Sequence, residues 1–72
     1  MEKKKIFISY DRGADVMYLN FDKPLKAEGE EVQTGIFARY NPGTHNLVGL
    51  TITNFSRKFG AKPTGVSIPA SN

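Results

Sequence analysis

Alternation of apolar and polar side chains with a period of two is the feature that most restricts the fold of this chain. Residues 5–11 place Ile6, Ile8 and Tyr10 on one face, and the same alternation recurs in three later segments. Successive side chains of a β-strand point to opposite faces of its sheet, so this period is typical of strands. The sequence therefore predicts an all-β or β-rich α+β fold.

Turn-forming residues divide the chain into four predicted strands, at residues 5–11, 16–21, 31–40 and 47–53. Pro24 is expected to end the second strand because proline cannot donate to a ladder, and residues 26–31 read as a charged connector. Gly35, inside the third segment, predicts a bulge or a close backbone approach. Since three of the connections are short, the simplest arrangement is a four-stranded antiparallel meander.

The C-terminal part of the chain has a weaker pattern. Phe55 and Phe59 are four residues apart, which predicts a single helical turn. Residues 64–68 lie between two prolines and form either a short edge strand or a loose tail. The length allows one domain. Within it, residues 1–56 are expected to form the β domain, and residues 57–72 a basic extension.

The chain has 72 residues and no cysteine, so a thin core must be stabilised without disulfides. A domain of this size buries only about 60% of the surface of its unfolded form, and small domains commonly add a metal or a partner. The single histidine, His45, has no cysteine to complete a zinc site and no neighbouring nucleophile to form a triad. We therefore predict no catalytic, cofactor-binding or metal-binding residues, and self-association remains as a stabiliser.

Apolar side chains on both faces of the predicted sheet indicate a contact surface. A sheet with one covered face should be polar on the other, yet Phe7, Tyr18, Phe37, Leu47 and Phe55 share the second face. Either the C-terminal segment folds over this face or another chain does. Exposed apolar patches mark interaction sites, and aromatic anchors supply most interface energy. Phe7, Tyr18, Phe37 and Leu47 are therefore candidate anchors for a homo-oligomer or a dedicated protein partner.

The excess positive charge lies in the C-terminal segment. Residues 1–40 carry seven basic and seven acidic side chains, whereas later residues add only Arg57, Lys58 and Lys62. Phe59 lies among them, and phosphate contact with base stacking needs this combination. Three charges favour a solubilising tail, so weak nucleic-acid binding is the alternative function. The apolar run near the N-terminus is too short for a signal peptide or a membrane span, which predicts a cytoplasmic protein with no membrane partner.

The turn between the first two strands holds the carboxylates that converge by sequence. Asp11 and Asp15 are four residues apart and could form a weak cation site or an acid–base pair. The favoured interpretation is that Asp11 closes the turn through an Asx hydrogen bond and Asp15 satisfies backbone donors of the next strand. Tyr10 and Tyr18 flank the turn. They could stack on a ring ligand, but strand tyrosines are more commonly packing residues.

Three motifs follow one another along the chain: Tyr10-Asp11-x-x-Ala14-Asp15-x-x-Tyr18-Leu19, Gly35-Ile36, and Leu47-Val48-Gly49-Leu50-x-Ile52. In this order they resemble the YuzE-like small bacterial and archaeal domains of unknown function (DUF2283), over about residues 6–56. The resemblance implies a small, mostly β protein. Some such domains lie beside toxin-like partners in two-gene modules, which implies an antitoxin-like or accessory role. Family members commonly carry a glutamate where this chain has Thr51.

Overall fold

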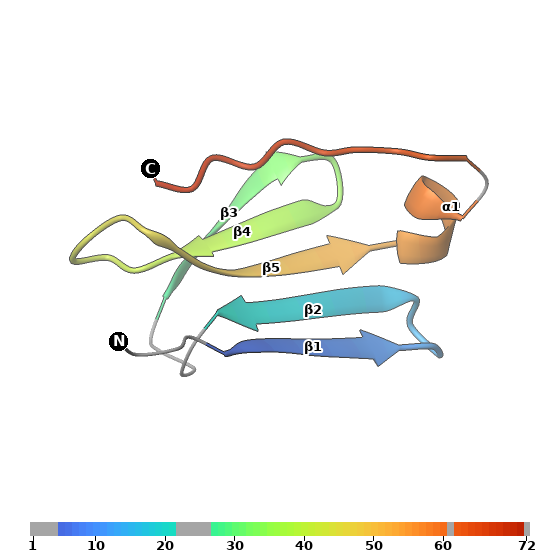
Figure 1. The fold of residues 1–72 in the computed structure, drawn as a ribbon, viewed down its shortest axis with the longest axis horizontal. Coiled ribbons are helices and arrows are strands. Elements are labelled where there is room, and N and C mark those ends of the chain that lie inside the picture. Colours follow the sequence, from blue (N-terminus) through green and yellow to red (C-terminus); the bar gives the residue numbers. More distant parts are fainter. Residues whose placement is uncertain (1–4, 22–26, 61, 72) are drawn as a thin grey trace.

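The described residues form a single antiparallel sheet of five strands followed by one short helix (Figure 1). The computed structural model describes residues 5–21, 27–60 and 62–71. The elements are β1 (Ile6–Asp11), β2 (Val16–Phe21), β3 (Glu28–Gln33), β4 (Ile36–Tyr40), β5 (Leu47–Thr53) and α1 (Phe55–Phe59). The predicted β-rich antiparallel fold class and the helical turn are confirmed. Within the described ranges, no helix has the length and apolar character needed to cross a membrane.

The third predicted strand is a hairpin of two strands, β3 and β4. Thr34 and Gly35 form its turn, and Gly35 has a φ of 75°, which glycine adopts without Cβ strain. Glu31 Oε2 accepts the backbone N–H of Gly35 at 3.0 Å. Part of the predicted connector is therefore strand, because one glycine in an alternating run fits a tight turn as well as a bulge. Pro24 and residue 26 lie outside the described residues.

The strand order is β1-β2-β5-β4-β3, so β5 inserts between β2 and β4 rather than following β4 at an edge. This order puts an apolar strand in the centre, where Gly49 and Ile52 are buried. It leaves β3, with the sequence EGEEVQ, at one edge. Charged side chains suit an edge because they oppose pairing with another chain.

The buried core is small and lies on one face of β4 and β5. Its hydrophobic side chains, among the residues described, are Ile36, Ala38, Tyr40 and Ile52. This face, here called the first face, continues across β2 and β1, where the register pairs Phe21 with Ile6, Leu19 with Ile8 and Met17 with Tyr10. The opposite side of the sheet is called the second face.

Residues 62–71 run in an extended path along the β3–β4 side of the sheet (Figure 1). The Tyr40 hydroxyl donates to the Pro69 carbonyl oxygen at 3.1 Å, and the Leu47 amide donates to the Ala70 carbonyl oxygen at 2.7 Å. Because Tyr40 belongs to the first face, the segment covers that face and not the second. Of the two alternatives for covering the second face, the one in which the C-terminal segment folds over it is therefore wrong. It makes no regular strand, although its hydrogen bonds tie it to the sheet.

Candidate functional site

The turn that joins β1 to β2 also holds the start of α1. Asp15 has a left-handed φ of 57°, and its carbonyl oxygen accepts the Phe55 N–H at 3.0 Å. Its carboxylate accepts the Ser56 N–H at 3.0 Å and the Ser56 hydroxyl at 2.8 Å. Asn54, at the N-cap position, makes no side-chain cap hydrogen bond. Asp15 therefore supplies the acceptors that a helix start needs, although it lies 41 residues before Ser56.

Tyr10 completes this cluster. Its hydroxyl donates to Asp15 Oδ1 at 2.5 Å, and its ring centroid lies 5.7 Å from that of Phe55, which packs against Phe59 at 5.1 Å. The hydrogen bonds from Tyr10 and then Ser56 lower the pKa of Asp15. The same hydrogen bond to Asp15 raises the pKa of Tyr10. The cluster thus favours a charged carboxylate beside a protonated phenol, which suits a structural contact between β1, the turn and α1.

The two aspartates of the turn have different partners. Asp11 Oδ1 accepts the Ala14 N–H at 3.2 Å, which is the Asx hydrogen bond favoured from the sequence. Asp15 binds backbone donors as well, but these belong to α1 and not to the next strand. In the parts of the chain that the structure describes, no group of three or more His, Asp or Glu side chains is arranged to hold a metal ion.

Tyr10 and Tyr18 lie on opposite faces of the β1–β2 hairpin. The register pairs Tyr10 with Met17 on the first face and Tyr18 with Ser9 on the second. The two rings therefore do not form the stacking platform that their positions around the turn had suggested. Tyr10 packs against Phe55 instead.

Gly49, the glycine of the third motif, lets an arginine side chain cross the sheet. The Arg39 guanidinium passes over it and donates to Asn20 Oδ1. A Cβ at position 49 would meet this guanidinium and would lie 2.9 Å from the Leu19 carbonyl oxygen. The residue is therefore glycine for a steric reason. Thr51, two positions on, pairs with residues of both β2 and β4.

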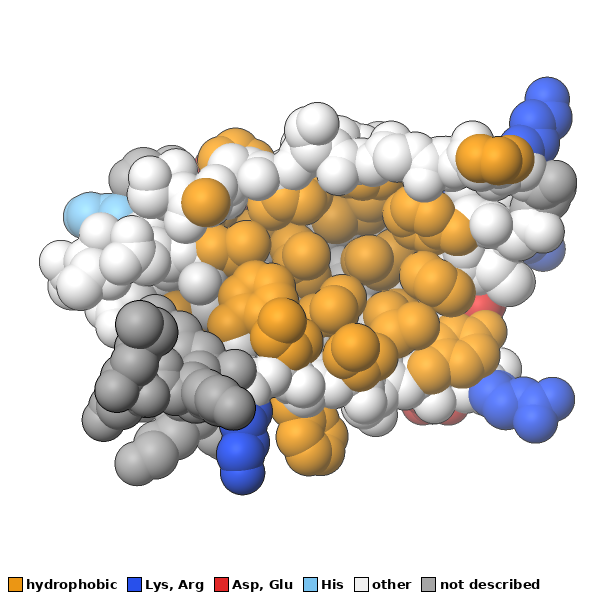
Figure 2. All heavy atoms as spheres, in the orientation of Figure 1, with side chains coloured by type: hydrophobic (Ala, Val, Ile, Leu, Met, Phe, Trp, Pro, Cys, Tyr) orange, Lys and Arg blue, Asp and Glu red, His pale blue; other side chains and the backbone are white. Residues whose placement is uncertain are grey.

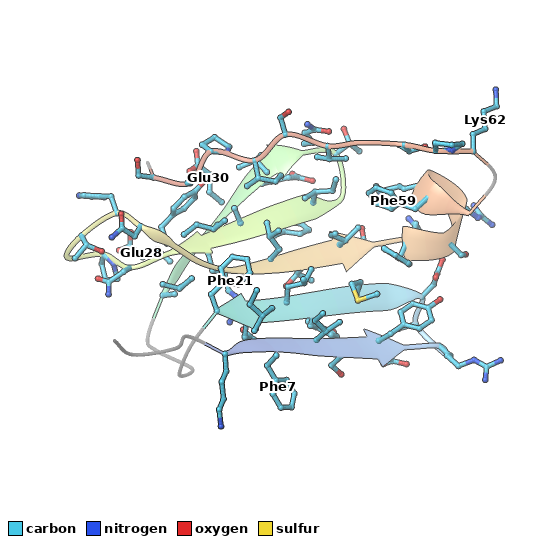
Figure 3. All side chains as sticks on the ribbon, in the orientation of Figure 1. Phe7, Phe21, Glu28, Glu30, Phe59 and Lys62 are labelled. Atoms are coloured by element: carbon cyan, nitrogen blue, oxygen red, sulfur yellow. The ribbon has the colours of Figure 1, made fainter. Side chains whose placement is uncertain are left out.

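Three of the four predicted interface anchors gather on the second face. Tyr18 and Phe37 both pair with Thr51 from opposite sides, and Phe7 lies on the same face of β1. Phe7 is 68% exposed and extends away from the sheet (Figure 3). Leu47 is separated from this group, because it pairs with Tyr40 at a shift in register.

Phe55, also expected on the second face, packs against Tyr10 of the first face. That expectation is wrong because the strand alternation does not continue into α1, which turns the ring back over the first face. The second face thus carries three aromatic side chains of the predicted set and is less apolar than the sequence suggested.

The larger apolar area lies on the first face, where Figure 2 shows hydrophobic side chains gathered across the sheet, and its most exposed part belongs to β1. Its residues on β1 and β2, here called the open apolar surface, are Ile6, Ile8, Tyr10, Met17, Leu19 and Phe21. Ile6 and Ile8 are 60% and 63% exposed. Residues 62–71 cover the β4 side of the same face. Sequence reasoning missed this surface, because alternation identifies an apolar face but does not reveal which part of it is covered.

The basic residues proposed for nucleic-acid contact have separate surroundings. Lys58 Nζ donates to the Thr53 carbonyl oxygen at 2.5 Å, and the ring of Phe59 packs against that of Phe55 within α1. Arg57 and Lys62 are exposed, and Lys62 extends away from the protein (Figure 3). Two of the four side chains are therefore engaged within the chain.

A pocket beside the end of β4 joins residues that are distant in the sequence. Glu28 and Glu30 of β3 line it together with His45 from the turn after β4. His45 is exposed and has a left-handed φ of 63°. The sequence contained no signal for this proximity, because β3 was expected to be a connector.

The part of the chain that matches a known protein family contains the sheet and the β1–β2 turn, and it stops before the C-terminal segment. Residues 8–56 match the family described as a protein of unknown function (DUF2283). The match ends at Ser56, the residue whose amide and hydroxyl bind Asp15. No curated protein and no solved structure matched the chain. Since the match covers more than half of the residues, the chain belongs to the DUF2283 family.

Proposed function

We propose that this protein acts in the cytoplasm by protein–protein contact, without catalysis of its own, through its open apolar surface. The observation that carries the proposal is a sheet whose apolar face is buried over β4, half-buried over β2 and exposed over β1. Six apolar side chains from two adjacent strands form this surface. Soluble monomers rarely expose contiguous apolar patches above a few hundred Å², and larger patches mark interaction sites.

The two edge strands of the sheet also support a protein contact on the side of β1. Every residue of β1 is exposed, and among the described residues β1 pairs only with β2. The opposite edge strand, β3, carries Glu28, Glu30 and Glu31, which oppose association. In β1 the only charged residue is Asp11, at its end. The apolar surface and the less protected edge therefore lie on the same side of the molecule.

The contacts of Tyr10 and Asp15 support a function other than catalysis. The phenol and the carboxylate bind each other, and the carboxylate also holds the first turn of α1. These hydrogen bonds lower the pKa of Asp15, which disfavours proton uptake near neutral pH. The partner of the open apolar surface is a second copy of the chain or a dedicated protein.

Photo-crosslinking in cells that express the chain tests this proposal. A photoreactive phenylalanine analogue replaces Ile8 in one variant and Ser9 in the other. The two positions are adjacent and exposed, but Ile8 pairs with Leu19 on the first face and Ser9 with Tyr18 on the second. Protein adducts are expected in much higher yield from position 8. Equal yields at both positions, or no protein adduct from position 8, contradict the proposal.

A further inference from the structure

We infer that a second copy of this chain covers the open apolar surface, so that two sheets pack face to face as a two-layered β-sandwich. The inference rests on the proposed function and names its partner. A sheet with one apolar face buries that face against another layer. In the described part of the chain, α1 and residues 62–71 pack onto only part of the first face. In this arrangement, the layer that covers β1 and β2 is the sheet of the second copy.

The small core also bears on which molecule covers this surface. The buried hydrophobic side chains of the described residues are four in number, and all lie on β4 and β5. Domains this small commonly depend on a disulfide, a metal or oligomerisation, and the sequence has no cysteine. We therefore expect the occupant to be available whenever the chain folds. A second copy satisfies this requirement without the synthesis of any other protein.

The exposed area of the chain agrees with an interface of ordinary size. A compact monomer of 8.0 kDa is expected to expose about 4,500 Å². This chain exposes 5627 Å², which is about 1,200 Å² more. Stable interfaces bury about 800 Å² on each partner. The excess, which is summed over the whole chain, is of the size that one dimer interface per chain would bury.

The chemistry of the surface also fits a copy of itself. The open apolar surface has no charged side chain, and its one polar group, the Tyr10 hydroxyl, already donates to Asp15. A two-fold axis in the interface places the same residues of both copies against each other. Apolar side chains then meet apolar side chains, with the sheets about 10 Å apart as in other β-sandwiches. Phe7 and Phe37 of the second face stay outside this interface.

Sedimentation equilibrium of the purified full-length protein, over about 1–200 µM, tests the inference through three substitutions. Wild type is expected to be a dimer of the 8.0 kDa chain. Ile8→Lys should raise the dissociation constant at least ~100-fold, since each copy loses a buried isoleucine and gains a charge in the interface. Ser9→Lys, its matched control on the second face, should remain a dimer. Phe37→Asp, which tests the second face directly, should also remain a dimer.

A second measurement uses wild-type protein and so does not depend on the folding of any variant. In a sample that mixes isotope-labelled and unlabelled chains, intermolecular NOEs are expected from the Ile6 and Ile8 methyl groups to Met17, Leu19 or Phe21. A monomer at every concentration overturns the inference, while a crosslink from position 8 to a different protein would still support the proposed function. A dimer unaffected by Ile8→Lys, or one dissociated by Phe37→Asp alone, also overturns it.

Discussion

Replacing Gly35 by alanine should destabilise the protein, because three elements meet at this residue. Its carbonyl oxygen accepts the Thr53 N–H at 2.9 Å and the Thr53 hydroxyl at 2.7 Å. A Cβ at position 35 would lie 2.6 Å from Thr53 Oγ1 and 2.8 Å from Lys58 Nζ. The hairpin turn, the end of β5 and α1 therefore all constrain the space that alanine needs.

Two contributions set the size of the effect. An L-residue in the left-handed region costs about 1–2 kcal/mol. Moving the Thr53 side chain away from the new methyl group loses a hydrogen bond worth about 0.5–1.5 kcal/mol. Together they predict a loss of about 1.5–3.5 kcal/mol in the free energy of unfolding. A chain of 72 residues has about 4–11 kcal/mol in total, so the variant should remain folded but be clearly weaker.

Urea unfolding followed by circular dichroism, at one fixed chain concentration, measures this loss. The slope should not change, and at about 1 kcal/mol per molar urea the midpoint should fall by about 1.5–3.5 M. Gly13→Ala is the matched control. Gly13 has no positive φ, and a Cβ there would lie an ordinary 3.5 Å from Asp11 Oδ1. If Gly35→Ala unfolds at the same urea concentration as Gly13→Ala, the steric reasoning is refuted.

Three further predictions concern the contacts around the sheet. Because the pKa of Asp15 is lowered by folding, its contribution to stability is complete above its ordinary value of 3.8 and is lost as the pH falls through the lowered pKa. Asp15→Asn should therefore reduce the difference between the urea midpoints at about pH 6 and about pH 3. An unchanged difference would show that other residues cause the loss of stability in acid. Tyr40→Phe should cost about 0.5–1.5 kcal/mol and loosen residues 62–71, so the Leu47 amide, which they protect, should exchange hydrogen faster. Equal exchange in wild type and variant would show that the hydroxyl does not hold the segment. Gly49→Ala should cost about 1–3 kcal/mol in thermal unfolding by overpacking, whereas Gly29→Ala, with open space around its Cβ, should cost much less.

The local sequence pattern was sufficient to predict three of the strands, the helical turn and the Asx turn. Alternation placed β1, β2 and β5 correctly because each strand carries its own period-two signal. At Gly35 the predicted close backbone approach is confirmed by the contact with Thr53. The pattern did not divide the third segment into two strands there, because a bulge and a hairpin turn have the same local sequence. It also did not provide the strand order. Which strand lies in the centre depends on the burial achieved by all five strands together.

The contact between Asp15 and Ser56 is another feature that the local sequence pattern could not predict. The motif identified Asp15 and Tyr10 as unusual, and the turn chemistry of Asp11 was readable from sequence. Nothing local connects Asp15 with Ser56, which lies 41 residues later. The contact exists because β5 pairs with β2, which brings the end of β5 and the start of α1 to the β1–β2 turn.

By itself, the sequence determined which side chains share a face. The pleat of a strand has a period of two, so Ile6 and Ile8 must lie opposite Phe7 and Ser9 in any sheet that contains them. Only the tertiary structure decided how much of that face is covered. The path of residues 62–71 depends on contacts such as the hydrogen bond from Tyr40, and these leave β1 exposed and β2 half-buried. Coverage is a property of non-local packing, and local periodicity carries no information about it.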